Sequence, residues 1–167
     1  MKNILVCCEL FEPSIGGVQK VVKELSENFI KLGNNVTIAT SKFDKKLPTV
    51  EKKKKNFKIL RYSIQGNSVR GITGESKKYQ KFLLETKFDY IFIYAAQQWT
   101  FDIIIPIIDK LKNKNIYFAP CGFSGLYNPR YFNYYSNLEI YLKKFNINVL
   151  HNNNYRDALF FKKKKNL

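Results

Sequence analysis

The chain has 167 residues, 45% of them hydrophobic, and its 29 lysines and arginines against 13 acidic residues give a formal net charge of +16. This apolar content excludes an intrinsically disordered chain, and the absence of any run of about 18 apolar residues excludes a membrane-spanning helix from the prediction. The positive charge predicts attraction to phosphate-bearing ligands or to an anionic membrane surface. The alternative is that the lysines only form solvated faces. Nucleic acid is not an expected partner, because most of the cations are lysines, which lack the bidentate base recognition of arginine.

The first 41 residues predict a strand, a glycine turn, a helix and a second strand. Residues 3–8 form an apolar run of strand length, which acidic residues follow too soon for a signal peptide. From residue 18 onward, apolar side chains recur at the spacing of one helix face, namely Val18, Val21, Val22, Leu25, Phe29 and Leu32. Gly33 suits the left-handed position that ends a helix, and residues 35–40 form a second, β-branched strand. Such strand–helix–strand units build parallel sheets.

The remaining residues continue the alternation of strands and helices. We expect strands at 57–62, 88–96, 115–120 and 148–151, and helices from about residue 76 to 87 and at 102–112, 131–143 and 155–163. The lysine-rich segment 41–56 is expected to be a loop. These elements predict one α/β, Rossmann-like domain over residues 1–167, with a mostly parallel, twisted sheet of about six strands and helices on both faces.

Ligands of parallel α/β sheets bind beyond the carboxyl ends of the strands, and this rule selects four loops. They are residues 9–17, 95–100, 121–130 and 151–155. The three cysteines predict no disulfide framework, since Cys7 and Cys8 are adjacent in one strand and Cys121 is far away. Their placement favours a reducing, cytoplasmic compartment.

Gly16 and Gly17 lie between the first strand and the first helix and are the strongest candidate for ligand binding. Glycines allow the backbone to approach a ligand closely, and the following helix directs unpaired N–H donors and the positive end of its dipole to the same place. This combination predicts an anion site, most naturally for phosphate. The alternative is that the two glycines only shape the turn.

The same segment resembles a known signature. Gly16-Gly17-Val18-Gln19, with Val22, Leu25, Leu32-Gly33 and residues 35–38, is similar to the N-terminal signature of family 4 glycosyltransferases, which have the GT-B fold. The resemblance covers residues 1–41 well and the remainder loosely. It implies an acceptor-side domain whose glycine loop lies against the donor diphosphate and the acceptor, with Gln19 beside it.

The resemblance also implies an activity. Family members transfer a sugar from a nucleotide-sugar, which is a substrate and not a cofactor, to a glycan or lipid-linked acceptor, as in the synthesis of cell-surface polysaccharides. The second, donor-binding domain of the family has no counterpart in residues 1–167, so we expect half of a retaining two-domain enzyme that is nearly inactive alone. The alternatives are a non-catalytic module for phosphorylated or lipid-linked ligands and half of a two-subunit transferase. The expected location is the cytoplasm or the inner face of the membrane.

Further candidates for the acceptor cleft follow the later strands. Tyr94 stands near a strand end where relatives carry histidines, and it is expected either to hydrogen-bond a sugar hydroxyl or to be a buried aromatic residue. Cys121 and Gly122 stand near the place of a His-Gly pair of relatives, and Arg130 is a candidate for contact with an acceptor phosphate.

His151 is the single histidine of the chain. A Cys121–His151 nucleophile–base pair is conceivable, although a shaped acceptor loop is the favoured interpretation. No partner lies at metal-ligand spacing from His151, so no metal site is expected. No residue is assigned a catalytic role.

Overall fold

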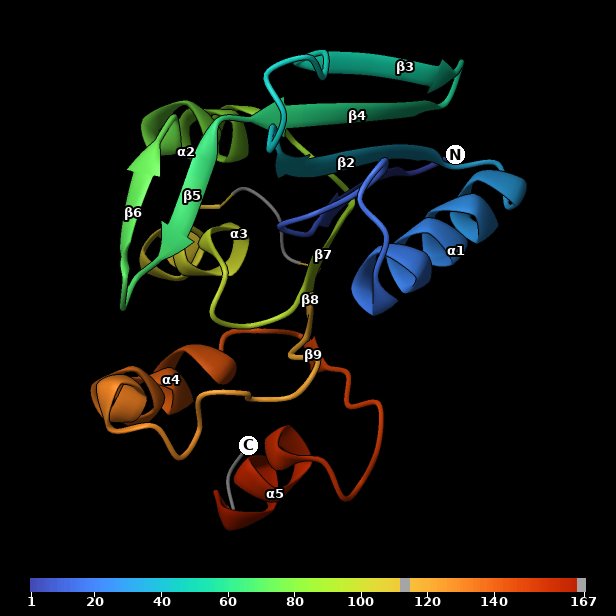
Figure 1. Ribbon diagram of the computed structural model, residues 1–167. Helices are drawn as coiled ribbons and strands as arrows, with labels where there is room; N and C mark the ends of the chain where they lie inside the picture. The colour runs from blue at the N-terminus through green and yellow to red at the C-terminus, as the bar shows by residue number, and fades with distance from the viewer. Residues whose placement is uncertain (112–114, 165–167) are drawn as a thin grey trace.

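The computed structural model describes residues 1–111 and 115–164, and a seven-stranded sheet forms its centre (Figure 1). The strand order is β3-β4-β2-β1-β7-β8-β9, and every neighbouring pair is parallel except β3 and β4. The strands are β1 Asn3–Cys7, β2 Asn35–Ser41, β3 Val50–Lys54, β4 Phe57–Tyr62, β7 Tyr90–Tyr94, β8 Ile116–Ala119 and β9 Ile147–Asn148. The predicted α/β fold with a mostly parallel sheet is confirmed.

Helices cover both faces of the sheet. They are α1 Gly17–Lys31, α2 Ser76–Glu85, α3 Trp99–Asp102, η1 Ile105–Lys110, η2 Pro129–Tyr131, α4 Phe132–Leu142 and α5 Arg156–Lys163. Figure 1 shows α1 on one side of the sheet and α2 and α3 on the other. The alternation of β1 explains this arrangement, since Ile4 and Val6 belong to the apolar cluster under α1, whereas Leu5 and Cys7 belong to the larger cluster on the opposite face.

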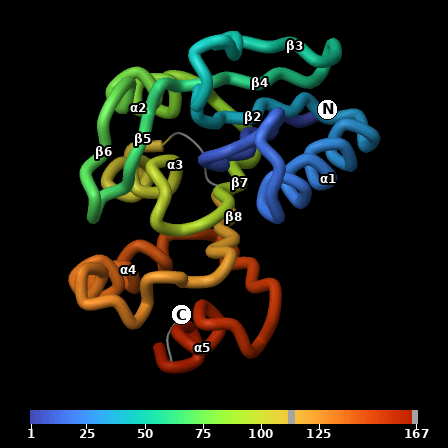
Figure 2. The backbone as a smooth tube through the Cα atoms, viewed as in Figure 1, coloured from blue at the N-terminus to red at the C-terminus, as the bar shows by residue number. Residues whose placement is uncertain are grey.

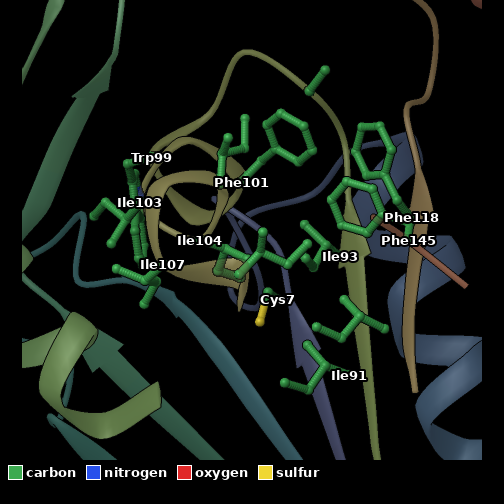
Figure 3. Close-up of a cluster of buried hydrophobic side chains, with 14 of the residues drawn as sticks. Cys7, Ile91, Ile93, Trp99, Phe101, Ile103, Ile104, Ile107, Phe118 and Phe145 are labelled. Carbon is green, nitrogen blue, oxygen red and sulfur yellow. The ribbon is translucent and has the colours of Figure 1, made fainter. Parts of the chain in front are cut away.

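The larger cluster is rich in aromatic residues (Figure 3). The ring of Phe118 on β8 packs against the rings of Phe101 and Phe145, with centroid distances of 4.3 and 5.1 Å, and those two rings also contact each other at 5.8 Å. Trp99 is fully buried, and its indole Nε1 donates a hydrogen bond to Ser41 Oγ at 2.7 Å. The core therefore ties α3 and the segment after α4 to the centre of the sheet.

The order of the strands reverses its direction between β1 and β7. From β1 the chain passes through α1 to β2 on one side, whereas from β7 it passes through α3 and η1 to β8 and then through α4 to β9 on the other. β1 and β7 are parallel neighbours, with Ile4 opposite Tyr90 and Cys7 opposite Ile93. Figure 2 shows the course of the chain from its blue N-terminal part, through β7 and β8, to the red C-terminal part. Such a reversal opens a crevice beyond the carboxyl ends of the two strands, which is where open α/β sheets bind ligands.

Helix α1 ends at the expected position, but fewer of its apolar residues are buried than the periodic pattern contains. Gly33 has a φ of +80°, and the N–H groups of Gly33 and Asn34 donate to the carbonyls of Ile30 and Phe29. Val21 and Leu32 share the apolar spacing of the helix face, but they are 38% and 76% exposed. Position 21 lies at the edge of the stripe, and Leu32 follows the last helical residue.

The prediction of a loop over residues 41–56 is wrong in part. Residues Val50–Lys54 form β3, which pairs antiparallel with β4 at the edge of the sheet. Its side chains are exposed except for that of Glu51, which is half-buried, so the strand lacks the apolar alternation that identifies other strands. Lysines are typical of edge strands because their charge opposes pairing with another chain.

Three further segments differ from the prediction. The glycine-containing stretch after β4 forms a separate hairpin, β5 Ile64–Asn67 and β6 Gly71–Gly74. The helix expected at 102–112 is the short α3 followed by the 3-10 helix η1, which ends at Lys110, and residue 112 lies outside the described residues. The last strand, expected at 148–151, is only Ile147–Asn148, so His151 follows the strand end by three residues.

Candidate functional site

The N-terminus of α1 has no side-chain cap. Gly16 is the N-cap residue in an extended conformation, with a φ of −179°, and no side chain of residues 1–111 and 115–164 accepts a hydrogen bond there. The first turn of α1 contains no acidic residue. Backbone N–H donors and the positive end of the dipole of a 15-residue helix are therefore directed at the glycine loop, with no acidic side chain in the first turn to offset them.

Gly17 does not need to be a glycine for the fold. An added Cβ at this position meets no atom of the described part of the chain within 4 Å, and the φ of Gly17 lies outside the left-handed region. An added Cβ at Gly16 would lie 2.6 Å from Oε1 of Gln19, which is a flexible side chain. The absence of a side chain at Gly17 leaves open space in front of the helix N-terminus.

Gln19 packs back onto the glycine loop. Its Nε2 donates a hydrogen bond to Ser14 Oγ at 3.1 Å, so the amide restrains the loop before α1. Gly16 and Gln19 line one wall of a cavity of about 760 Å³, together with residues 12–15, Lys20 and Lys23. The opposite wall comes from Leu47, Pro48, Glu51, Lys53 and Arg61. We call this space the glycine-loop cavity.

A smaller, polar pocket of about 220 Å³ lies at the reversal between β1 and β7. Glu9, which follows β1, and Gln97, which follows β7, line it together with Arg70 and Asn67 of the hairpin segment. The two loops are joined directly, because the backbone N–H of Glu9 donates to Oε1 of Gln98 at 3.1 Å. We call this space the switch-point pocket.

Gln97 is held from several sides in an uncommon backbone conformation, with a φ of +60°. Its N–H donates to the hydroxyl of Tyr134 at 3.0 Å, and its carbonyl accepts a hydrogen bond from Asn67 Nδ2 at 3.0 Å. Its side-chain Oε1 accepts one from Ser124 Oγ at 3.1 Å. Ala95 and Cys121 also have positive φ angles, of 67° and 57°. Non-glycine residues in this region carry strain, and here they cluster at the carboxyl edge of β7 and β8.

Two carboxyl groups near this pocket have perturbed acidity. Burial is the main cause that raises the pKa of Glu9, and the nearby charge of Asp102 raises it further, whereas Arg70 lowers it. Burial also raises the pKa of Asp102, although its carboxylate accepts hydrogen bonds from Ser68 N at 2.8 Å and from Tyr134 Oη at 3.0 Å. Carboxyl groups with shifted pKa values in a polar crevice are typical of functional sites.

Cys121 and His151 do lie together. Cys121 Sγ is 3.5 Å from His151 Nε2, and the ring centroids of Tyr94 and His151 are 6.1 Å apart. Burial raises the pKa of Cys121 to about 11, so the thiol is neutral near pH 7. The geometry of a nucleophile–base pair is present, but the acidity that a thiolate nucleophile needs is absent. Tyr94 is 7% exposed and packs in the cluster under α1, which matches the buried-aromatic interpretation of this residue.

Two predicted site residues are engaged elsewhere. The N–H of Gly122 donates to Oδ2 of the fully buried Asp157 at 2.9 Å, so it joins the β8 loop to α5. Arg130 is exposed and lines a different cavity, together with Asp102 and Tyr134. Gly16 with Gln19, Cys121 with Gly122, and Arg130 line three different cavities, so the predicted candidates do not form one constellation.

The residues around the switch-point pocket were not singled out from the sequence. Glu9 and Gln97 fall within two of the four predicted loops, and an acidic residue directly after an apolar strand is a usable signal. Asn67 and Arg70 had no such signal, because the hairpin that carries them was not predicted. Within residues 1–111 and 115–164, no group of three or more His, Cys, Asp and Glu side chains is arranged to hold a metal, and no helix has the length and apolarity to cross a membrane.

Comparison with known proteins identifies the fold. No protein-family profile matches the chain, and no curated protein sequence matches it. Sucrose-phosphate synthase from Thermosynechococcus elongatus has a similar structure, with a TM-score of 0.55 and 14% identity over 72% of this chain and 33% of that chain. An alpha-glucosyltransferase solved with UDP and a 13-mer DNA containing a central A:G mismatch gives a TM-score of 0.53 and 17% identity over 95% and 39%.

A shorter chain of the same sucrose-phosphate synthase aligns with a TM-score of 0.52 and 13% identity, over 98% of this chain and 96% of that one. The chain thus spans a third to two fifths of the two longer neighbours. These neighbours are GT-B glycosyltransferases, and the chain has the fold of a Rossmann-like domain of that architecture.

Proposed function

We propose that the chain is the N-terminal, acceptor-side half of a retaining, family 4-like glycosyltransferase, which moves a sugar from a nucleotide-sugar to a glycan or lipid-linked acceptor. One observation carries the proposal. The helix N-terminus at Gly16 is uncapped, and Gly17 leaves space in front of it that the fold itself does not require. The resemblance of residues 16–38 to the family signature and the GT-B fold support it.

The site residues take different parts in this proposal. The N–H donors at Gly16 and Gly17 hold the donor diphosphate and stabilise the negative charge that develops as it leaves. The switch-point pocket binds the hydroxyls of the acceptor sugar. There Glu9 accepts hydrogen bonds from them and Arg70 donates hydrogen bonds to them, while Gln97 supplies a rigid backbone. The donor-binding half is a further domain or a partner subunit, and the cell-surface polysaccharides are the proposed product class.

Replacing Gly17 by Leu tests the glycine loop. Because the added side chain points into open space, the variant should keep the circular dichroism spectrum and melting temperature of the parent. It should lose at least tenfold in affinity for UDP and UDP-sugars, measured by calorimetry and by amide shifts of α1, because the side chain blocks the approach to the N–H donors. Ile15→Val is the control, since Ile15 is 98% exposed in the same loop.

The outcome separates the proposal from its rivals. Unchanged nucleotide affinity in a folded Gly17→Leu protein would rule out the glycine loop as the phosphate site. Transfer of labelled sugar by the full native polypeptide supports the enzyme. Ligand binding without any transfer would instead indicate a binding module for phosphorylated or lipid-linked ligands.

We also propose that the cationic surface places the protein at the inner face of an anionic membrane. Lys52, Lys53 and Lys54 on β3 are all exposed, and the formal net charge is +16. Binding to vesicles with anionic lipid should be measurable by co-sedimentation at low salt and should be lost in about 0.5 M salt, where the Debye length is only a few ångströms. Equal binding to neutral vesicles would contradict an electrostatic attachment.

A further inference from the structure

We infer that a lysine-lined cavity at the amino edge of the sheet binds a phosphate-bearing ligand, as a second anion site apart from the glycine loop. The cavity has a volume of about 530 Å³, and we call it the amino-edge cavity. It lies where β1, β2 and β4 begin, beside the turn between β3 and β4 (Figure 1). The inference goes beyond the proposed transferase and does not depend on it, because the glycine loop and the switch-point pocket lie at the carboxyl ends of the strands.

The lining of the amino-edge cavity is strongly cationic. Five of its residues are lysines, namely Lys52, Lys54, Lys55, Lys58 and Lys87, and no acidic residue of the described chain lines it. All five lysines are exposed, and within residues 1–111 and 115–164 none of them forms a salt bridge. Three asparagines and two threonines complete the polar lining and add neutral hydrogen-bond donors. The cavity is therefore a concave surface with an excess of positive charge.

The register of three strands places two of these lysines side by side. Lys58 on β4 lies opposite Lys52 on β3 and opposite Thr37 on β2. Because side chains alternate along a strand, Glu51 and Lys53 point to the other face, where they line the glycine-loop cavity. Like charges directly opposite each other on neighbouring strands destabilise a sheet. A bound anion would offset this repulsion between the two lysines.

Protection of the sheet edge explains only part of the cluster. Lysines oppose pairing of an edge strand with another chain, which accounts for those of β3. Lys58 stands on β4, which has a neighbouring strand on each side, and Lys87 belongs to the connection between α2 and β7. The pKa of Asp89 is lowered mainly by the hydrogen bond from the Asn3 N–H, and the charge of Lys87 adds to this effect. Asp89 also pairs with Lys2 at 3.6 Å, so this one acid cannot neutralise the cluster.

The chemistry of the lining favours phosphate over other anions. Lysine binds phosphate as a compact point charge, whereas arginine is better suited to the bidentate recognition of planar carboxylates, and no arginine of the described chain lines the cavity. A phosphate monoester carries about −1.5 to −2 charges at pH 7, so it can attract several ammonium groups at once. The volume lies within the range of roughly 300–1,000 Å³ that is typical of small-molecule sites. Two sources share this chemistry, a free phosphorylated metabolite and a phosphomonoester lipid headgroup.

The first test titrates the ¹⁵N-labelled protein with pyrophosphate in about 0.15 M salt, where the Debye length is about 8 Å and diffuse attraction is largely screened. We expect saturable shifts of the amide signals of Thr37, Lys52 and Lys58. Shifts in the first turn of α1 report the glycine loop separately, so this inference and the proposed function can fail independently. Saturable shifts at α1 alone, or at neither place, would overturn the inference.

Two matched double variants provide the control, both made in the Gly17→Leu background so that the glycine loop does not contribute. Lys52→Gln with Lys58→Gln should weaken pyrophosphate binding at least tenfold, while the melting temperature stays equal or rises because a like-charge pair is lost. Lys45→Gln with Lys46→Gln removes the same charge from the connection between β2 and β3, at the other edge of the sheet, and should change the affinity less than twofold. Equal weakening by both pairs would indicate attraction by net charge alone and would contradict a site.

Vesicles that contain phosphatidic acid separate the two sources of the phosphate. Displacement of pyrophosphate by these vesicles, and loss of vesicle binding in the Lys52→Gln, Lys58→Gln variant, would assign the site to a lipid headgroup. The carboxyl-edge sites would then face away from the bilayer, because the cavity lies at the opposite edge of the sheet. Retention of pyrophosphate in the presence of the vesicles would assign the site to a free phosphorylated ligand.

Discussion

At the residue scale, the Cys121 thiol lies beside a histidine, as a nucleophile would, but its pKa is too high for it to react as a thiolate near neutral pH. It lies 3.5 Å from His151 Nε2, but burial raises its pKa to about 11, so roughly one molecule in a thousand carries the thiolate at pH 8. We therefore expect slow reaction with a thiol reagent at pH 8, with a rate that keeps rising with pH up to the limit of folding. In the proposed transferase, Cys121→Ser should change sugar transfer by less than about threefold, because a neutral thiol does not serve as a nucleophile.

The buried cysteines are the internal control for the labelling experiment. Burial raises the pKa of Cys7 to about 12 and that of Cys8 still higher, and both are fully buried, so they should react only after unfolding. Fast labelling of Cys121 that levels off near neutral pH would show an activated thiolate and would restore the nucleophile–base interpretation.

Single residues were predictable where local geometry alone decides their role. Gly33 was recognised because a helix end needs a left-handed residue, and its φ of +80° agrees. Glu9, Arg70 and Gln97 come from three loops far apart in sequence. Their proximity is a product of the strand order, which residue patterns do not contain.

At the element scale, the edge strand β3 depends on one ion-pair network. The hydrogen bond from Lys53 is the largest cause that lowers the pKa of Glu51, and Arg61 adds to it, against the opposing effect of burial. A lowered pKa in the folded state means that Glu51 stabilises the protein fully above its unfolded pKa, about 4.3, and loses this contribution as the pH falls through the folded value.

Glu51→Gln should therefore destabilise the protein at pH 7, by about 1–3 kcal/mol, because the buried Arg61 loses a charged partner. The difference from the parent should shrink below about pH 4 as the parent carboxylate itself is protonated. Urea unfolding at pH 7 and pH 3.5 measures both values. Glu85→Gln is the control, since the Glu85 side chain is 64% exposed, and a pH-independent difference for Glu51→Gln would contradict this account.

Elements were predictable where burial imposes a period. The central strand β7 and the helix α1 carry apolar patterns because one or both of their faces are covered. β3 and the β5–β6 hairpin escaped the prediction because edge strands and glycine-rich hairpins bury too few side chains to show a period. The sheet therefore has seven strands where about six were expected.

At the scale of the whole molecule, the order of strands creates the candidate site. The strand–helix–strand pattern predicts a parallel sheet and, through it, the four loops at its carboxyl edge. It does not decide which loops meet: Gln97 contacts Ser124 and Asn67, whereas Arg130 borders another cavity. The strand order reverses between β1 and β7, and the position of this reversal depends on tertiary packing in the two apolar clusters on the faces of the sheet.

The cluster on the α2 and α3 side should decide the stability of the whole domain. Phe118 is fully buried in a group of three mutually contacting rings with Phe101 and Phe145, so Phe118→Ala removes stacking and leaves a cavity. The expected loss is about 3–5 kcal/mol, a large part of the 5–15 kcal/mol typical of a folded domain. For a chain of this size the melting temperature should fall by roughly 6–20 °C.

The single tryptophan is the reporter for this measurement, because Trp99 is fully buried in the same cluster. Its fluorescence and the far-ultraviolet circular dichroism should follow one coincident transition in urea, since α3 and β8 share the core. Phe132→Ala is the matched control, because Phe132 is 55% exposed and its loss should cost less than about 0.5 kcal/mol. Similar small losses of unfolding free energy for both variants would contradict the prediction that this cluster decides the stability of the domain.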